Sequence, residues 1–148
     1  METLRGGEDF KQLADRLNEA ADAKLRRQVY KGLREIARPV GEAMTHALGG
    51  ALPQRNGLGP RVAKSKIRQT NATTGKNPRV VVWLKSAEGY DLAGMEAGTV
   101  RHPTYGHKPW VGQSVPSGRA TEAATAMAPL VRKNLERHIN TTLDEIGK

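Results

Sequence analysis

Residues 10–50 read FKQLADRLNEAADAKLRRQVYKGLREIARPVGEAMTHALGG, and their apolar side chains recur at steps of three and four. That spacing is the period of one helix face and predicts a single long amphipathic helix. Asp9 or Glu8 is suited to cap its N-terminus, and Gly49-Gly50 predicts its end. The apolar stripe consists of Phe10, Leu13, Leu17, Ala21, Leu25, Val29, Leu33, Ile36, Val40, Met44 and Ala47.

The length of this helix bears on assembly. A helix of about 38 residues is roughly 57 Å long, which exceeds the diameter of so small a domain. Its outer turns then need apolar cover from another chain, so we expect self-association; the alternative is that the stripe packs within one monomer. Because Pro39 lacks a backbone donor, we also expect a kink near Ile36, with the apolar face continuing through it.

The middle of the chain carries two strand-like segments, Lys66–Ala72 and Arg79–Lys85, and the second is rich in β-branched residues. Residues 73–78, TTGKNP, have the composition of a turn, which predicts an antiparallel hairpin with a basic tip. A short helical turn is expected just before it, at Arg61–Ser65.

Between Glu88 and Gly118 the sequence is rich in Gly and Pro and lacks a clear period. This pattern predicts a long ordered loop with one short strand around Leu92–Ala97. A last helix is expected to begin with Ser117 or Thr121 as its N-cap. Its apolar stripe is Met127, Val131, Leu135, Ile139, Leu143 and Ile146, and Pro129 predicts either a kink or the true first turn.

These elements predict an α+β fold in which a small antiparallel sheet lies between two long helices. A length of 148 residues fits one domain, with the N-terminal helix in 1–50, the sheet and loops in 51–118, and the C-terminal helix in 119–148. Only 37% of the residues are apolar and 4% aromatic, so the core is thin and further burial between copies would compensate for it. No apolar run approaches the length of a membrane span.

The net charge of +9 is concentrated in the middle of the chain. Gln54 to Trp110 contains ten basic and three acidic residues, and no acidic residue occurs between Glu42 and Glu88. A continuous field of one sign indicates a polyanion or an acidic protein as partner, or else a solvated face that keeps the protein soluble. The candidate contacts for DNA backbone or an acidic partner are Arg55, Arg61, Lys64, Lys66, Arg68, Lys76 and Arg79.

Signals for catalysis are weak. The chain has no cysteine, which excludes disulfides and thiolate metal sites. His102 and His107 are five residues apart in a Pro/Gly-rich segment, where the helical spacing of two metal-binding histidines does not apply. Neither a nucleophile motif nor a phosphate-binding loop is present, so we expect no enzyme activity, no cofactor and no metal.

The segment Glu96-Ala97-Gly98-Thr99-Val100-Arg101-His102-Pro103, with Tyr105-Gly106 and Pro109-Trp110 after it, resembles the small neck or head-tail joining proteins of siphophages of the lambdoid type, a group that includes minor-tail and tail-completion proteins. The order of elements is similar over nearly the whole chain. In that family an aromatic residue commonly precedes the Gly-Thr step, where this chain has Ala97.

The resemblance implies a virion protein of the neck, made in the host cytoplasm, that joins the capsid portal to the tail in a ring around the DNA passage. We expect a homo-oligomeric ring, sixfold or a multiple of six, with a portal-side adaptor or head-closure protein on one side and a tail terminator or tail tube protein on the other. The alternatives are a tail terminator subunit, a protein that binds nucleic acid non-specifically, and a small hydrolase. The expected subunit or partner contacts are Glu96, Gly98, Thr99, Arg101, His102, Tyr105, Trp110, Leu25, Val29 and Leu33.

Overall fold

The computed structural model describes residues 23–54, 57–72, 79–104 and 107–146, and it has the expected α+β fold. The first part of the helical stripe, Arg55, the hairpin tip with Lys76, and Tyr105 lie outside these ranges. Along the chain the elements are α2 (Ala23–Ala51), α3 (Leu58–Ala63), β1 (Lys66–Ala72), β2 (Arg79–Lys85), α4 (Leu92–Glu96), β3 (Thr99–Thr104), β4 (His107–Ser114), α5 (Arg119–Ala126) and α6 (Ala128–Ile146).

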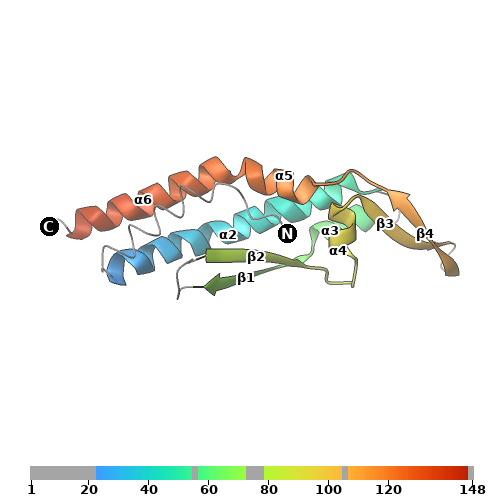
Figure 1. Ribbon diagram of the computed structural model, residues 1–148, viewed down its shortest axis with the longest axis horizontal. Coiled ribbons are helices and arrows are strands. Elements are labelled where there is room, and N and C mark those ends of the chain that lie inside the picture. The colour runs from blue at the N-terminus through green and yellow to red at the C-terminus, as the bar shows by residue number, and fades with distance from the viewer. Residues whose placement is uncertain (1–22, 55–56, 73–78, 105–106, 147–148) are drawn as a thin grey trace.

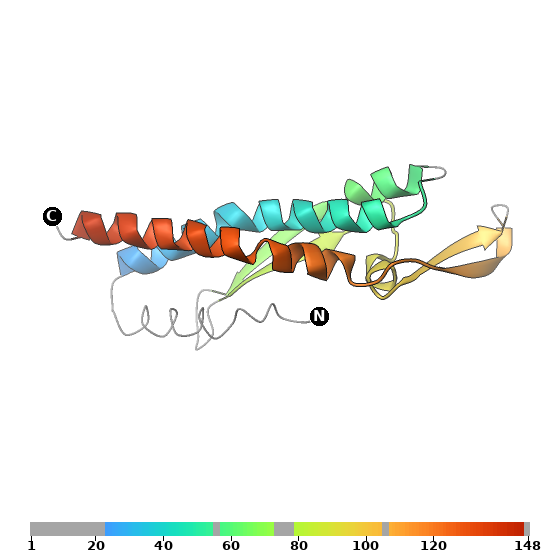
Figure 2. The same ribbon diagram turned by 90° about the horizontal axis from the view of Figure 1, so that it is seen from above.

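Helix α2 forms the centre of an elongated molecule. It lies between α5 and α6 on one side and the β1–β2 hairpin on the other (Figure 1). Seen from above, the β3–β4 hairpin projects from one end of the molecule and the C-terminal end of α6 lies at the other (Figure 2). The long axis of the molecule therefore follows the two long helices.

Helix α2 is one element of 29 residues that continues through Pro39. It also continues past Gly49-Gly50, where the sequence predicted its end, and Gly49 serves the packing of α3 instead. A Cβ atom at Gly49 would lie 2.5 Å from the carbonyl oxygen of Gly59, so only glycine permits so close an approach. Gly49 is thus a contact point between two helices, and α2 ends at Ala51.

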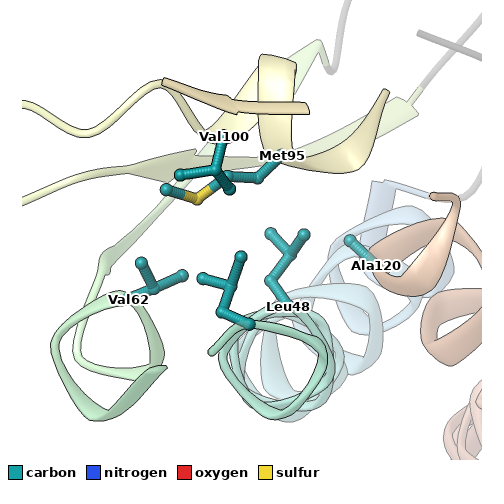
Figure 3. Close-up of a cluster of buried hydrophobic side chains, with 6 residues drawn as sticks. Leu48, Val62, Met95, Val100 and Ala120 are labelled. Atoms are coloured by element: carbon teal, nitrogen blue, oxygen red, sulfur yellow. The ribbon is translucent and has the colours of Figure 1, made fainter. Parts of the chain in front are cut away.

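Two apolar clusters stabilise the body. The larger one is formed where α2, α3, α4, β3 and α5 meet, and its side chains point toward one another (Figure 3). The smaller one joins the first turns of α2 to the middle of α6, where Asn134 Nδ2 donates to the carbonyl oxygen of Gly32 at 2.9 Å. The larger cluster contains Leu48, Leu52, Val62, Met95, Val100 and Ala120, and the smaller one Leu25, Val29 and Leu135.

The β1–β2 hairpin has the strands that the sequence predicted, paired antiparallel from Lys66 with Lys85 to Ala72 with Arg79. Its inner face lies on α2 at Gly41, where a Cβ atom would meet Ile67 Cγ2 at 2.5 Å. The missing side chain at Gly41 therefore lets the strand approach the helix.

The prediction for residues 88–118 was wrong. Leu92–Glu96 is a helix, with Asp91 Oδ1 accepting from the backbone N–H of Gly94 at 2.9 Å as its cap. The rest is a second antiparallel hairpin, β3–β4, with a register shift between Pro103 and Thr104. A strand is identified in sequence by alternating apolar and polar residues, which arise when one of its faces is buried. The described side chains of β4 are exposed on both faces, so the sequence lacks this alternation.

The C-terminal helical region is divided at Met127 into α5 and α6, so Pro129 lies in the first turn of α6 as one of the two expectations had it. The expected N-cap was wrong. Gly118 precedes α5 in the left-handed conformation, with φ 70°, and provides no side-chain cap. The cap comes from Glu96, far upstream in the sequence.

Candidate assembly interface

The β3–β4 hairpin is an exposed arm. Among the described residues its base is anchored by Val100, which is part of the larger cluster. The seven residues from Lys108 to Ser114 are all exposed, including Trp110 at 52% and Val111 at 44% of their surface. Exposed apolar groups of this size on a projecting strand are typical of an interface.

The arm also lacks the support that a hairpin needs. It is a two-stranded sheet with no third strand among the described residues. Such a ribbon is marginal by itself in water, and a strand without a neighbour on one side is open to pairing with another chain. Contact with another molecule would supply both the apolar cover and the missing edge partner.

Glu96 fixes the base of the arm to the start of α5. Its Oε2 accepts from the backbone N–H of Ala120 and its Oε1 from that of Thr121, both at 2.9 Å. Its carbonyl oxygen accepts from the N–H of Gly118 at 2.8 Å. A carboxylate at a helix N-terminus satisfies free donors and complements the helix dipole. Both carboxylate oxygens of Glu96 therefore serve as this cap, while Arg101 is exposed on β3.

Gly98 makes the turn from α4 into β3. Its φ of 98° is in the region that favours glycine. A Cβ atom there would also lie 3.2 Å from Ser117 Cβ and from the carbonyl oxygen of Val115. Its own carbonyl oxygen accepts from the N–H of Val115 at 3.0 Å. Glu96 and Gly98 together form a joint between the arm and the helical body, and Thr99 opens the first strand of the arm.

A second surface of interest is the outer face of β1–β2, defined by Lys66, Arg68, Arg79, Lys85 and Trp83. In the register, Lys66 pairs with Lys85, Arg68 with Trp83 and Ala72 with Arg79, which places these five side chains on the face opposite Ile67. All five are exposed. None of the four basic residues forms an ion pair with a residue in the described parts of the chain.

The two other candidate basic residues that the structure describes, Arg61 and Lys64, belong to α3 and its C-cap and not to this face. Arg61 lies on α3, where its Nη1 donates to the phenol oxygen of Tyr90 at 3.5 Å and is 3.9 Å from Glu88 Oε2. The hydrogen bond to Tyr90 and the charge of Glu88 raise the pKa of Arg61. Lys64 is exposed at the end of α3. Arg61 is thus engaged within the chain.

The α2 residues expected at a subunit contact lie inside the molecule. Leu25 and Val29 are buried against Leu135 of α6, and Leu33 packs at the margin of this cluster. Because α6 already covers them, they offer little surface to a second copy.

The free end of α6 exposes an apolar residue that the sequence placed in the stripe. Leu143 is 50% exposed, and Thr142 takes the buried position beside it, with its hydroxyl donating to the carbonyl oxygen of His138 at 2.8 Å. Asp144 is also exposed. Helical period alone predicted the reverse, with Leu143 in the buried stripe.

The described residues contain no cluster of three or more His, Asp or Glu side chains that could hold a metal ion. The backbone of His102 and His107 lies in the arm. Within the same ranges, no helix is both long and apolar enough to cross a membrane.

Models of known protein families, curated proteins and solved structures were all compared with this chain, and none of them matches it.

Proposed function

We propose that this chain is a non-catalytic structural subunit of a siphophage neck, forming a ring at the junction of capsid and tail. The observation that carries the proposal is the β3–β4 arm, whose strand β4 leaves about half of the surface of Trp110 and Val111 exposed, at 52% and 44%. A protein that keeps such an arm in solution gains stability when a neighbour covers it.

The resemblance to head-tail joining proteins supports the location in the virion. Its motif contains Glu96 and Gly98, which build the joint at the base of the arm, and Trp110, which the arm exposes. The residues that carry the resemblance therefore coincide with the part of the molecule best suited to assembly.

The two ends of the molecule are complementary in chemistry. The arm presents Trp110 and Val111 near the cations Arg101 and Lys108, with no acidic residue between Glu96 and Glu122. The opposite end, on α6, presents Leu143 beside Asp144. Contact between unlike ends of identical subunits is heterologous and produces a closed ring when the rotation per subunit closes. We therefore assign the arm of one copy to the α6 end of the next.

The flat sides of such a ring would meet a portal-side adaptor or head-closure protein and a tail terminator or tail tube protein. The tail terminator itself is the alternative position for this chain. Localising the protein in purified particles separates the two, because a neck subunit lies between portal and terminator.

The test of assembly uses the full chain and two variants at equally exposed tryptophans. Native mass spectrometry and electron microscopy of the wild type should show closed rings, with six subunits or a multiple of six. Trp110→Ser with Val111→Ser should give folded monomers, because it removes the apolar surface of the arm.

The matched control is Trp83→Ser, at 49% exposure on the other hairpin, which should leave the rings intact. A wild type that stays monomeric at high concentration, or rings that tolerate the arm variant, would contradict the proposal.

A further inference from the structure

We propose that the outer face of β1–β2, formed by Lys66, Arg68, Arg79 and Lys85 around Trp83, binds the phosphate backbone of duplex DNA. The inference does not depend on ring formation, since it rests on the register and charge of one hairpin in a single copy.

The charges of this face repel one another within a single copy. Lys66 and Lys85 are directly opposite each other on one face of the hairpin. Like charges in that position destabilise a strand pair. The hairpin keeps this pair with no acidic residue among the described residues to neutralise it by an ion pair, and an external anion would relieve the repulsion.

The four cations are spread along the length of the hairpin. Alternate residues on a strand are about 6.8 Å apart, so Lys66 and Arg68 on β1 and Arg79 and Lys85 on β2 spread four cations over the hairpin. A linear polyanion can meet all four at once, whereas a single carboxylate or phosphate group cannot. The chain as a whole is basic, with a net charge of +9, which favours approach to such a polymer.

The chemistry of the face favours duplex DNA over single strands and over an acidic protein. Single-strand binding uses several aromatic rings on which successive bases stack, and this face has one, Trp83, whose indole N–H donates to Thr70 Oγ1 at 3.0 Å. A protein interface has an apolar centre depleted in charge, whereas on this face Trp83 and the half-buried Val81 lie among four cations. Phosphate contacts need only Lys and Arg within reach.

The position of the face is compatible with assembly. The hairpin lies on the side of α2 away from α5 and α6, and along the flank of the molecule rather than at its ends (Figure 1). A head-to-tail ring therefore leaves this surface free.

The experiment measures binding of the full chain to a short duplex of arbitrary sequence by fluorescence anisotropy over a series of salt concentrations. Each phosphate contact contributes about 0.9 to the slope of log K against log salt. The variant with Lys66, Arg68, Arg79 and Lys85 all changed to Gln should lose roughly 3 to 4 units of that slope.

The control has the same loss of four charges at exposed positions elsewhere, with Lys31, Arg34, Lys64 and Lys133 changed to Gln. Its slope should change by less than about one unit. Lys66→Arg with Lys85→Arg retains the charges and should bind as the wild type does, which separates lost contacts from a fold defect. Trp83→Ala should not alter the salt slope for the duplex.

Equal losses in the two fourfold variants would overturn the inference, because binding would then follow net charge alone. Tighter binding to a single strand that is lost in Trp83→Ala would also overturn it. So would a wild type that ignores the duplex but binds polyglutamate through this face, since the partner would then be an acidic protein.

Discussion

At the scale of single residues, Glu96 connects two segments that are distant in sequence. Its carboxylate accepts from the backbone N–H groups of Ala120 and Thr121, which would otherwise remain free at the start of α5. Glu96→Ala should lower the free energy of unfolding by about 1–2 kcal/mol, because a side-chain cap is lost and the helix dipole is no longer complemented.

Urea unfolding followed by circular dichroism measures this loss as a lower midpoint at an unchanged slope. Glu136→Ala is the control, since Glu136 is exposed on α6 and a change there should stay within about 0.5 kcal/mol. Equal effects of the two substitutions would mean that the cap contributes nothing.

Tyr30 is a buried residue of α2 whose phenol oxygen has no hydrogen-bond partner in the described parts of the chain. Its pKa is raised above 10.0, chiefly because burial disfavours the phenolate, although the charge of Arg26 opposes this. Because the pKa of Tyr30 is higher in the folded state, its contribution to the free energy of unfolding is fully present below about pH 10. This contribution is lost as the pH rises through the folded-state pKa. Tyr30→Phe should remove this alkaline loss and should be neutral or stabilising by about 1 kcal/mol near neutral pH.

Both effects of Tyr30→Phe are tested by comparing its unfolding midpoint with that of the wild type at about pH 7 and about pH 10.5. Tyr90→Phe is the contrasting variant, because the Tyr90 hydroxyl donates to Glu88 Oε2 at 3.0 Å and its loss should reduce stability. A less stable Tyr30→Phe protein at neutral pH would show that the hydroxyl has a favourable contact.

At the scale of elements, the contact between α2 and β1 depends on a single missing methyl group. Gly41→Ala would place its Cβ 2.5 Å from Ile67 Cγ2. The substitution should cost about 1–3 kcal/mol through overpacking, although alanine is the better helix former. Combining it with Ile67→Ala should cost less than the sum of the two single changes, by about 1 kcal/mol or more.

The control for this pair is Gly50→Ala, in the same helix but with open space around the added carbon. It should raise stability by about 0.5–1 kcal/mol, since only helix propensity changes. Additive effects at Gly41 and Ile67 in thermal or urea unfolding would show that the strand can move away from the helix.

The sequence predicted the elements that have a long apolar stripe or a β-branched run, and it missed the short helix α4 and the β3–β4 arm. Strands β1 and β2 have the predicted bounds because a β-branched run, Val80 to Val82, is flanked by turn residues. Helix α2 follows from its stripe as far as the described residues extend. The arm gave no such signal, since the described side chains of β4 are exposed on both of its faces.

The residues of the candidate interface were also predicted only in part from the sequence. The resemblance drew attention to Glu96, Gly98 and Trp110, and these lie at the base of the arm or on it. Leu25 and Val29 were assigned to a subunit contact because an apolar stripe does not reveal which helix covers it. Trp83 and Lys85 were missed since only the strand register places them beside Arg68 and Lys66.

At the scale of the whole molecule, the proposed surfaces are separate. The arm and the free end of α6 lie at opposite ends of the long axis, and the basic face of β1–β2 lies along its flank (Figures 1 and 2). Ring formation and DNA binding therefore involve different residues. A variant that loses one property should retain the other.

The head-to-tail contact makes a prediction that a symmetric contact does not. Trp110→Ser with Val111→Ser removes the arm surface and leaves the α6 end intact. Leu143→Arg does the reverse, because it places a cation where Arg101 and Lys108 of the neighbour would arrive. Each variant alone should be monomeric, since each lacks one of the two unlike surfaces that a heterologous contact requires.

An equimolar mixture of these two variants restores one intact contact per pair, between the arm of the Leu143→Arg protein and the α6 end of the other. Native mass spectrometry with one partner isotopically labelled should therefore detect heterodimers and no larger rings. If arms instead paired with arms, the Leu143→Arg protein would form homodimers by itself and the mixture would add nothing. The single measurement thus separates a ring-forming contact from a closed dimer, and only the former can encircle a DNA passage.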